Sequence, residues 1–152
     1  MIIKVIPDTN VILKGMFGYK SNERKILSLS LAKKISLYGS SQTYDEFCQK
    51  VRKPSLQRYW TKKNFSADKI VLDYKTLVNM HEPFGSAATK TISLRDPEDE
   101  MFIRVALSCG AKIIVSADKD LLDVKEFEGV KIITADKFVD TYFNIHPLGL
   151  IS

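Results

Sequence analysis

Short apolar segments alternate with amphipathic segments along nearly the whole of this chain. The apolar segments have the length of strands and lie at residues 2–7, 36–40, 112–115 and 130–133. A strand that reads as an almost continuous apolar run is typical of a parallel sheet that is buried on both faces. Alternation of such strands with helices therefore predicts an α/β fold, in which helices cover both faces of a mostly parallel sheet.

The segments between the strands show helical periodicity or helix-starting signals. Residues 42–52 place Tyr44, Phe47 and Val51 on one face, and this helix ends before Pro54. Residues 96–100 supply a capping aspartate, a proline and first-turn acids for a helix that ends at Gly110. We expect a loop over 81–89. Further helices are expected after 8–10, from 21–23 through Ile35, over 55–63 as a short helix or turn, from 66–68 through Val78, near 120–122 and over 136–144.

Length and composition indicate one soluble globular domain. The chain has 152 residues, of which 45% are hydrophobic and 27% charged. We expect a domain over residues 1–145 and a C-terminal tail over 146–152. No apolar run approaches the roughly 18–20 residues of a membrane span, and Lys4 interrupts the first run, so neither a membrane anchor nor a signal peptide is expected. Cys48 and Cys109 form no metal or redox motif, which predicts reduced core thiols in a cytoplasmic protein.

Carboxylates follow two of the expected strands. Asp8 comes directly after the first strand, and Asp118 closely follows residues 112–115. Acids at the carboxyl ends of parallel strands meet in one crevice, where two unit charges about 4 Å apart repel by roughly 4 kcal/mol at an effective dielectric near 20. A divalent cation would relieve this repulsion, and hard oxygen ligands favour Mg²⁺ or Mn²⁺. The alternative is helix capping, and Asp120 is a second candidate to cap the helix near 120–122, which would leave Asp118 free.

Two further acids are candidates for the same crevice. Asp99 shares its helical stripe with Phe102, Ile103 and Ala106, so it opens a face that otherwise points inward. Compensation of the helix dipole would explain an acid there, but a buried carboxylate also needs a partner, and a metal ion is a natural one. Glu46 lies roughly opposite the apolar face of its helix and is expected to be exposed, as both a surface glutamate and a ligand in an open crevice would be.

The net charge of +5 is concentrated in one segment. Residues 50–63 contain six basic residues and no acid, and Tyr59 and Trp60 lie among them. Such a segment suits a nucleic-acid backbone with unstacked bases, and it equally suits a solvated helix whose aromatic rings pack inward. An acidic site in a basic protein would hold an anionic substrate near bound cations, which favours nucleic acid. The expected contacts are Arg52, Lys53, Arg58, Lys62 and Lys63.

In order and spacing, the polar motifs resemble the acidic signature of the PIN-domain nucleases. The matching residues are Asp8-Thr9-Asn10, Ser40 with Glu46, Asp99 at a helix start, and Ser116-Ala117-Asp118. The runs 95–100 and 118–122 are similar to one prokaryotic branch, described as toxin components of toxin–antitoxin pairs and related to the VapC-type toxins. The resemblance extends over roughly residues 2–143.

The resemblance implies a three-layer α/β/α sandwich and cleavage of single-stranded RNA with one or two Mg²⁺ or Mn²⁺ ions. It also implies a homodimer and a small antitoxin partner. The residues it assigns are Asp8, Glu46, Asp99 and Asp118 as catalytic metal ligands, Asn10 and Ser116 as supporting polar residues, and Asp96 and Asp120 as auxiliary acids. Whether Asp118 or Asp120 lies nearer the metal is left open.

Two other functions compete with this assignment. Aspartyl phosphoryl transfer of the haloacid dehalogenase type needs a second Asp two residues after the first, where this chain has Asn10, and no acceptor Asp of the receiver-domain type is evident. A PIN-like module that binds RNA or protein without cleavage is the non-enzymatic alternative. The complete set of acids argues against the module.

Overall fold

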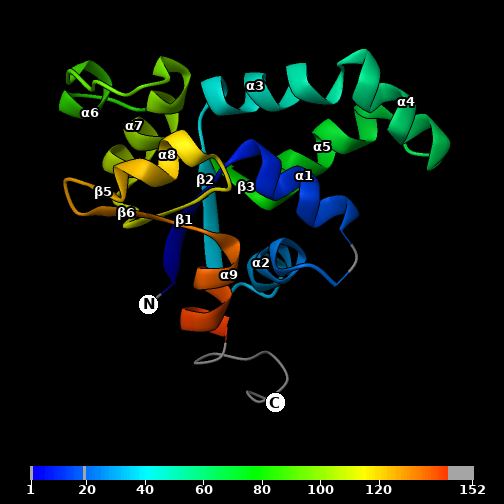
Figure 1. Ribbon diagram of the computed structural model, residues 1–152, viewed down its shortest axis with the longest axis horizontal. Helices are drawn as coiled ribbons and strands as arrows, with labels where there is room; N and C mark the ends of the chain where they lie inside the picture. Colours follow the sequence, from blue (N-terminus) through cyan, green and yellow to red (C-terminus); the bar gives the residue numbers. More distant parts are fainter. Residues whose placement is uncertain (1, 19, 144–152) are drawn as a thin grey trace.

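The computed structural model describes residues 2–18 and 20–143. Strands and helices alternate along most of this range, as predicted (Figure 1). The elements are β1 Ile3–Pro7, α1 Thr9–Phe17, α2 Asn22–Leu31, β2 Ile35–Gly39, α3 Ser41–Val51, α4 Pro54–Lys62, α5 Ala67–Leu77, β3 Val78–Met80, α6 Ser86–Thr89, the 3₁₀ turn η1 Pro97–Asp99, α7 Glu100–Cys109, β4 Ile113–Val115, α8 Lys119–Val124, β5 Glu126–Phe127, β6 Val130–Ile133, α9 Ala135–Phe138 and the π-helical turn η2 Val139–Phe143.

The strands form one sheet in the order β3-β2-β1-β4-β6-β5. All neighbouring pairs are parallel except β5 with β6, so the predicted α/β fold with a mostly parallel sheet is confirmed. In the central pair, Pro7 of β1 lies opposite Val115 of β4, so both strands end at the same level. The sheet therefore delivers the residues after β1 and β4 side by side at its carboxyl edge.

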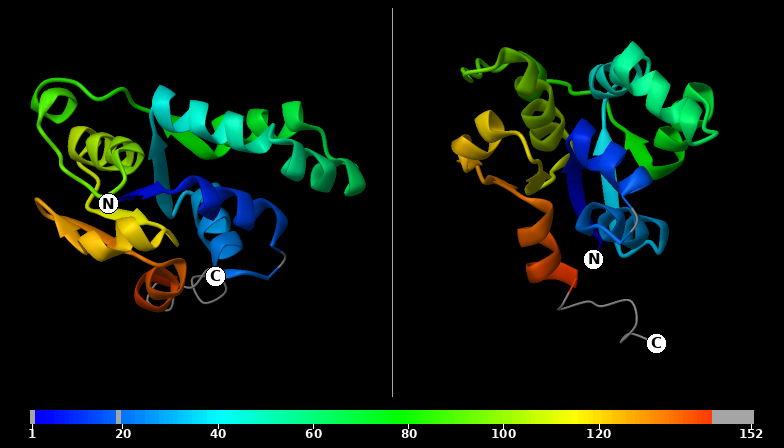
Figure 2. Two further views of the ribbon diagram at one scale, coloured as in Figure 1. Left: turned by 45° about the horizontal axis from the view of Figure 1, so that its top comes forward. Right: turned by 45° about the vertical axis from the view of Figure 1, so that its right-hand side comes forward.

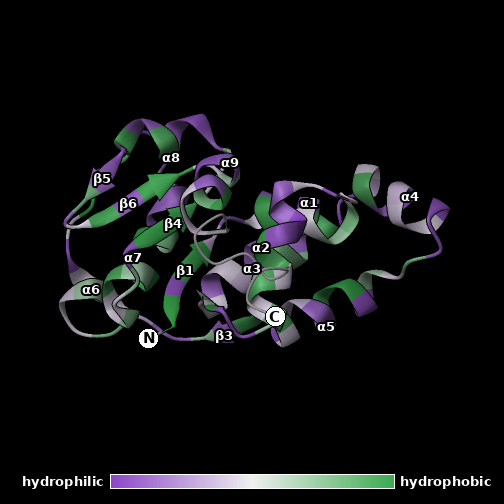
Figure 3. Cartoon of the chain, turned by 90° about the horizontal axis from the view of Figure 1, so that it is seen from below, coloured by the Kyte–Doolittle hydropathy of each residue, from purple (hydrophilic) through white to green (hydrophobic). Residues whose placement is uncertain are grey.

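Adjacent residues of a strand supply two separate cores. Val5 belongs to the core under α1, α2, α3 and α5, whereas Ile6 belongs to the core under α7 and α8. In β4, Ile113 and Ile114 divide in the same way. Figure 2 shows helices on both sides of the sheet, and Figure 3 shows the apolar character of β1, β4 and β6 between them. This arrangement is the three-layer α/β/α sandwich that the resemblance implied.

Local capping positions the two helices that carry candidate acids. Ser40 and Thr43 form a reciprocal capping box, in which each side chain accepts from the backbone N–H of the other, so α3 begins directly after β2. The Asp96 side chain accepts from the backbone N–H of Glu98 and opens the turn that leads into α7. Gly110 ends α7 with φ of 81°, a left-handed conformation that suits glycine.

The structure corrects several predicted element boundaries. Ile35, predicted to lie on the helix that became α2, is the first residue of β2, because the chain turns at Lys33 with φ of 60°. Val78, predicted as part of the stripe of α5, begins β3, which is the edge strand beside β2. Residues 86–89 of the predicted loop form the short helix α6, and β5 was not predicted.

Three remaining predictions concern membrane spans, the cysteines and the C-terminal tail. Within residues 2–18 and 20–143, no helix combines the length and the apolar character that crossing a membrane requires. Both cysteines are free thiols, with Cys109 buried and Cys48 half-buried. The predicted tail 146–152 lies outside the described residues.

Candidate active site

The candidate site lies at the carboxyl edge of the sheet, where β1 and β4 end. Asp8 follows β1, and its backbone N–H donates to the carbonyl of Val115 at 2.9 Å. Ser116 follows β4 and is almost fully buried. In Figure 1 this edge faces α3, on the opposite side of the sheet from the N-terminus. The residues that begin α1, α7 and α8 therefore gather at this edge of the sheet, opposite α3.

Ser116 joins two of the acids through its hydroxyl group. Its Oγ donates to Oδ2 of Asp8 at 2.7 Å and accepts from the backbone N–H of Asp118 at 2.9 Å. Asp8 is 6% exposed, and its side chain makes no capping hydrogen bond to α1, so capping does not explain this acid. Burial raises the pKa of Asp8 above its usual range, and the bond from Ser116 partly offsets that rise.

Asp99 is a buried acid whose negative charge is unfavourable in the folded protein. It is 7% exposed, and it makes no capping bond to α7, which excludes a simple capping role. Its Oδ2 is buried and has no hydrogen-bond partner within the described residues. Burial, and then the charges of Asp118, Asp96 and Asp8, raise the pKa of Asp99 from 3.8 to about 7. The prediction that Asp99 points inward from the apolar stripe is confirmed.

Asp96, Asp99 and Asp118 bring three carboxylate groups together, with one oxygen of each within 4.8 Å of the others. Asp118 itself caps α8, because its Oδ1 accepts from the backbone N–H of Asp120 at 2.9 Å. The suggestion that Asp120 is the cap is therefore wrong. Asp120 instead faces Arg95, whose guanidinium lies 3.2 Å from its Oδ1.

Glu46 lies on α3 and contacts the first turn of α1, next to Asp8. The hydroxyl of Thr9, a buried residue, donates to Oε2 of Glu46. Glu46 is half-buried, so the expectation of an exposed side chain is wrong. A helical wheel considers α3 alone, whereas Thr9 at the start of α1 lies against this face of α3. Burial raises the pKa of Glu46, the bond from Thr9 opposes the rise, and the charge of Asp8 adds to it.

Two polar residues that the prediction did not assign also act on the acids. Thr9 holds Glu46, and its position between Asp8 and Asn10 was the available signal. Lys50 lies one turn beyond Glu46 on α3, and its positive charge lowers the pKa of both Asp8 and Glu46. The spacing of four residues between Glu46 and Lys50 was readable in the sequence, since such pairs share a helix face.

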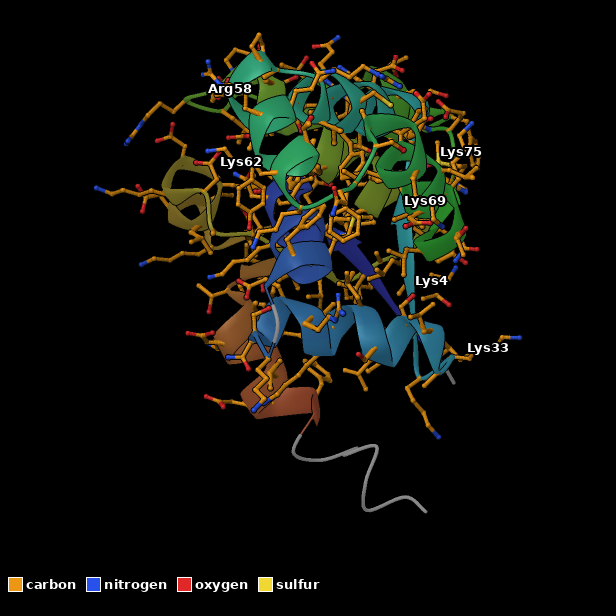
Figure 4. All side chains as sticks on the ribbon, turned by 90° about the vertical axis from the view of Figure 1, so that its right-hand side faces the viewer. Lys4, Lys33, Arg58, Lys62, Lys69 and Lys75 are labelled. Atoms are coloured by element: carbon orange, nitrogen blue, oxygen red, sulfur yellow. The ribbon has the colours of Figure 1, made fainter. Side chains whose placement is uncertain are left out.

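The remaining predicted residues lie around the acids and not among them. Asn10 is exposed, and its amide has no hydrogen-bond partner within the described residues. Arg52 pairs with Asp68 at 2.8 Å. Figure 4 shows Arg58 and Lys62 on α4, on the same side of the view as α8, whereas Lys69 and Lys75 of α5 lie on the other. All five residues of the predicted basic set are exposed, namely Arg52, Lys53, Arg58, Lys62 and Lys63.

The basic segment 50–63 was predicted either to present its aromatic rings to unstacked bases or to pack them inward, and the structure shows one ring of each kind. Trp60 is 3% exposed, and its indole N–H donates to the carbonyl of Val51 at 3.0 Å. Tyr59 is 43% exposed. One ring therefore packs inward, as on an ordinary helix, and the other remains available on the basic surface.

The donor set fits a hard divalent cation. The ligand groups are carboxylate oxygens from two separate parts of the chain, the turn 96–99 and Asp118, and one oxygen of Asp99 is buried and has no hydrogen-bond partner within the described residues. A neutral partner would not remove the mutual repulsion that raises the pKa of Asp99, whereas a cation would. Oxygen-only ligands of this kind suit Mg²⁺ or Mn²⁺. We name Asp8, Glu46, Asp96, Asp99 and Asp118 together the acidic cluster.

Comparisons with known proteins agree with this architecture. A family model described as PIN domain matches residues 4–120. The uncharacterized protein MJ1680 of Methanocaldococcus jannaschii is 30% identical over 132 residues, which cover 82% of this chain and 76% of that protein.

Two crystal structures share the fold. One is VapBC2 from Rickettsia felis bound to a DNA fragment from their promoter, with a TM-score of 0.60 and 12% identity over 86% of this chain and 97% of that chain. The other is DNA-bound VapBC from Salmonella typhimurium, with a TM-score of 0.57 and 17% identity over 88% and 99%. Since the family model covers well over half of the sequence, the chain belongs to the PIN-domain family.

Proposed function

We propose that this protein is an endoribonuclease that hydrolyses phosphodiester bonds of single-stranded RNA with Mg²⁺ or Mn²⁺, and that it is the toxin of a toxin–antitoxin pair. The observation that carries the proposal is the unpaired buried oxygen of Asp99 beside the carboxylates of Asp96 and Asp118. That oxygen lies in a cluster whose mutual repulsion needs a positive ion.

In this proposal, the acids act first as ligands. Asp8, Asp99 and Asp118, with Glu46, would hold one or two ions, and Ser116 fixes the orientation of both Asp8 and Asp118. A bound ion would supply an activated water and would neutralise the charge that builds on the phosphate in the transition state. Glu46, whose carboxylate accepts a hydrogen bond from Thr9, would orient the attacking water, and Asp118 is the alternative for that role.

The substrate would be held by positive charge outside the acidic cluster. Lys50 lies closest, because its charge acts on both Asp8 and Glu46. Farther out, the exposed residues Arg58, Lys62 and Lys63 of α4 and its C-terminal end suit the phosphates of a single strand. A polyanion bound there would lie with its scissile phosphate near the acids.

The family and the structural neighbours support the biological assignment. The neighbours are structures of VapBC complexes from Rickettsia felis and Salmonella typhimurium. By analogy we propose a small antitoxin as a protein partner and a homodimer as the assembly. Isolation of this protein with a small co-purifying protein from its native source tests the first of these, and light scattering tests the second.

The activity is tested with a single-stranded RNA labelled with a fluorophore and a quencher, incubated with Mn²⁺, with Mg²⁺ and with EDTA. We expect cleavage with either ion and none with EDTA. Asp8→Asn and Asp99→Asn should abolish cleavage while the circular dichroism spectrum remains native. Undiminished metal-dependent cleavage by both variants would refute the assignment of the site.

The same experiment separates the competing functions. If RNA binds with a steep salt dependence but is not cleaved, and Mn²⁺ neither binds nor raises the melting temperature, the protein is a binding module. If a phosphate analogue traps an acyl phosphate on Asp8, the protein belongs instead to the aspartyl phosphoryl-transfer enzymes.

A further inference from the structure

We infer that the groove between α1 and α4 is a subsite for an unstacked base of the substrate strand, in which the base stacks on Tyr59. The inference rests on the proposed function and assigns a position on the protein to one base of the strand whose scissile phosphate lies at the acids. We call this feature the α1–α4 groove. It has a volume of about 430 Å³, and its lining includes Asn10, Lys14, Phe17, Leu56, Tyr59 and Trp60.

Tyr59 presents an aromatic ring that the protein does not itself stack. It is 43% exposed. It meets Phe17 and Trp60 in T-shaped contacts, with ring centroids 6.1 and 5.1 Å apart and interplanar angles of 81° and 76°. By contrast, Phe17 and Trp60 stack on each other at 4.0 Å and 23°. Of the rings in the described residues, none lies parallel on Tyr59. The ammonium of Lys63 lies over this ring, at the end of a flexible side chain that a planar ligand can displace.

The charges around the groove select an anionic chain as the source of that planar ligand. Arg58 and Lys62 lie near Tyr59 on α4, and Lys63 follows the helix, with its Nζ 5.6 Å from the centroid of the Tyr59 ring. Figure 4 shows Arg58 and Lys62 projecting from α4. Lys14 adds a further ammonium group to the lining, although it also pairs with Glu23 at 3.6 Å. Exposed aromatic rings among basic side chains are how proteins bind single strands, since phosphates pair with the cations and bases stack on the rings.

The groove is continuous with the acidic cluster through α1. Asn10, which lines the groove, directly follows Thr9, whose hydroxyl donates to Glu46. Asp8 begins the same helix. A strand whose phosphate lies at the acids can therefore follow α1 from Asn10 to Tyr59, which contacts Phe17 at the end of that helix, roughly 12 Å away by helix rise. The exposed amide of Asn10 offers both a donor and an acceptor to a strand that enters the groove.

The experiment compares two strands in EDTA, so that no cleavage occurs. One is a short oligoadenylate, and the other is an abasic strand of the same length with the same phosphates. Trp60 is the single tryptophan of the chain, and its contact with Tyr59 makes its fluorescence a reporter for the groove. Tyr59→Leu keeps an apolar side chain but removes the aromatic face, Tyr59→Phe keeps that face, and Phe84→Leu is the matched control. Phe84 is 67% exposed and precedes α6, at the opposite end of the molecule from α4 in Figure 1.

We expect Tyr59→Leu to weaken oligoadenylate binding about five- to thirty-fold, which lies in the lower part of the range for base–aromatic stacking, and to leave abasic binding unchanged. Tyr59→Phe and Phe84→Leu should both bind the oligoadenylate like the wild type. The salt dependence of binding should be the same for wild type and Tyr59→Leu, because no phosphate contact is lost.

The subsite is refuted if Tyr59→Leu binds the oligoadenylate like the wild type, if it weakens both strands equally, or if Tyr59→Phe fails to restore binding. Loss of binding to a protein partner in Tyr59→Leu, with unchanged binding of both strands, would assign the groove to that partner instead. These outcomes are separable from failure of the proposed function. A wild type that binds oligoadenylate through Tyr59 but never cleaves RNA retains the subsite and loses the nuclease assignment.

Discussion

Asp8 and Asp99 expose 6% and 7% of their surface, whereas the basic residues of α4 are exposed. The acids are held by strand ends, by a serine hydroxyl and by first turns of helices, and each of these constraints derives from the core of the sheet. The basic side chains project from a helix outside the sheet, and in Figure 1 α4 lies at the far end of α3. The contrast is consistent with the two tasks proposed above: a rigid centre of mutually repelling acids for a cation, and an adaptable surface for a flexible polyanion.

The two regions also differ in their effect on folding. Burial and mutual repulsion raise the pKa values of Asp8, Glu46 and Asp99, so the cluster opposes folding when it is ionised. Exposed cations are screened by solvent and cost little. Removal of an acid should therefore stabilise the metal-free protein and abolish its activity, whereas removal of a basic residue should weaken binding with little effect on stability.

The largest expected effect is on catalysis by Asp99→Asn. We expect loss of RNA cleavage by at least about a hundredfold, because several kcal/mol of transition-state stabilisation by the ion would disappear. The same variant should have a higher melting temperature than the wild type in EDTA at neutral pH. The matched control is Asp73→Asn, which removes an acid of α5 that pairs with Lys69 and should leave cleavage unchanged. Cleavage by Asp99→Asn at the wild-type rate would remove the distinction between the two regions.

The second effect is a pH dependence of the stability of the metal-free protein. Since the pKa of Asp99 is raised from 3.8 to about 7, the folded state binds more protons than the unfolded state between these values. The free energy of unfolding should therefore decrease as pH rises from about 4 to 7, by up to about 4 kcal/mol from this residue.

Urea denaturation in EDTA across this pH range measures that dependence. The raised pKa values of Asp8 and Glu46 act in the same direction. Asp99→Asn should make the profile flatter, and Asp73→Asn should not change it. A free energy of unfolding that rises between pH 4 and 7 would contradict the electrostatic description of the cluster.

A smaller effect is expected for Ser116→Ala. This change removes the donor to Asp8 and the acceptor for the backbone N–H of Asp118, so both ligands lose orientation. We expect activity or Mn²⁺ affinity to fall about tenfold, as for other groups that orient metal ligands. Ser30→Ala, which removes a serine bond to the carbonyl of Leu77 away from the site, is the control. Equal effects of the two variants would indicate general destabilisation.

The smallest effect is expected for Lys62→Gln on α4. We expect the affinity for single-stranded RNA to fall about two- to fivefold at low salt and the slope of log K against log salt to fall by about 0.7. Lys33→Gln is the control, because Lys33 lies far from Lys62 in Figure 4. Fluorescence anisotropy at several salt concentrations measures both slopes. An unchanged slope for Lys62→Gln would exclude this residue from the RNA-binding surface.

Much of the fold was predictable because its strongest signals are local. The apolar runs that became β1 and β4 are bounded by polar residues, and their parallel pairing places Asp8 and Ser116 at one edge. The errors arose where local signals conflict with tertiary contacts. Val78 continues the apolar stripe of α5, but pairing with β2 makes it a strand residue. Ile35 likewise continues the spacing of α2 past a turn at Lys33 that no glycine or proline marks.

The sequence predicted which acids lie close together better than it predicted their contacts. Asp99 was identified because an acid on an apolar stripe violates the pattern of its own helix. The environment of Glu46 could not be predicted, because its burial depends on Thr9 of a different helix. The division of roles between Asp118 and Asp120 depends on Arg95, which lies far from both in the sequence and pairs with Asp120.

The central claim is that the acidic cluster holds a divalent cation, and calorimetric titration of Mn²⁺ into the metal-free protein near neutral pH tests it most directly. We predict saturable binding to the wild type with release of protons, because the carboxyl of Asp99 must lose its proton to act as a ligand. Asp99→Asn, folded by circular dichroism, should bind far more weakly, and Asp73→Asn should bind like the wild type. Equal Mn²⁺ affinity of Asp99→Asn and the wild type, or absence of binding to either, would contradict the account.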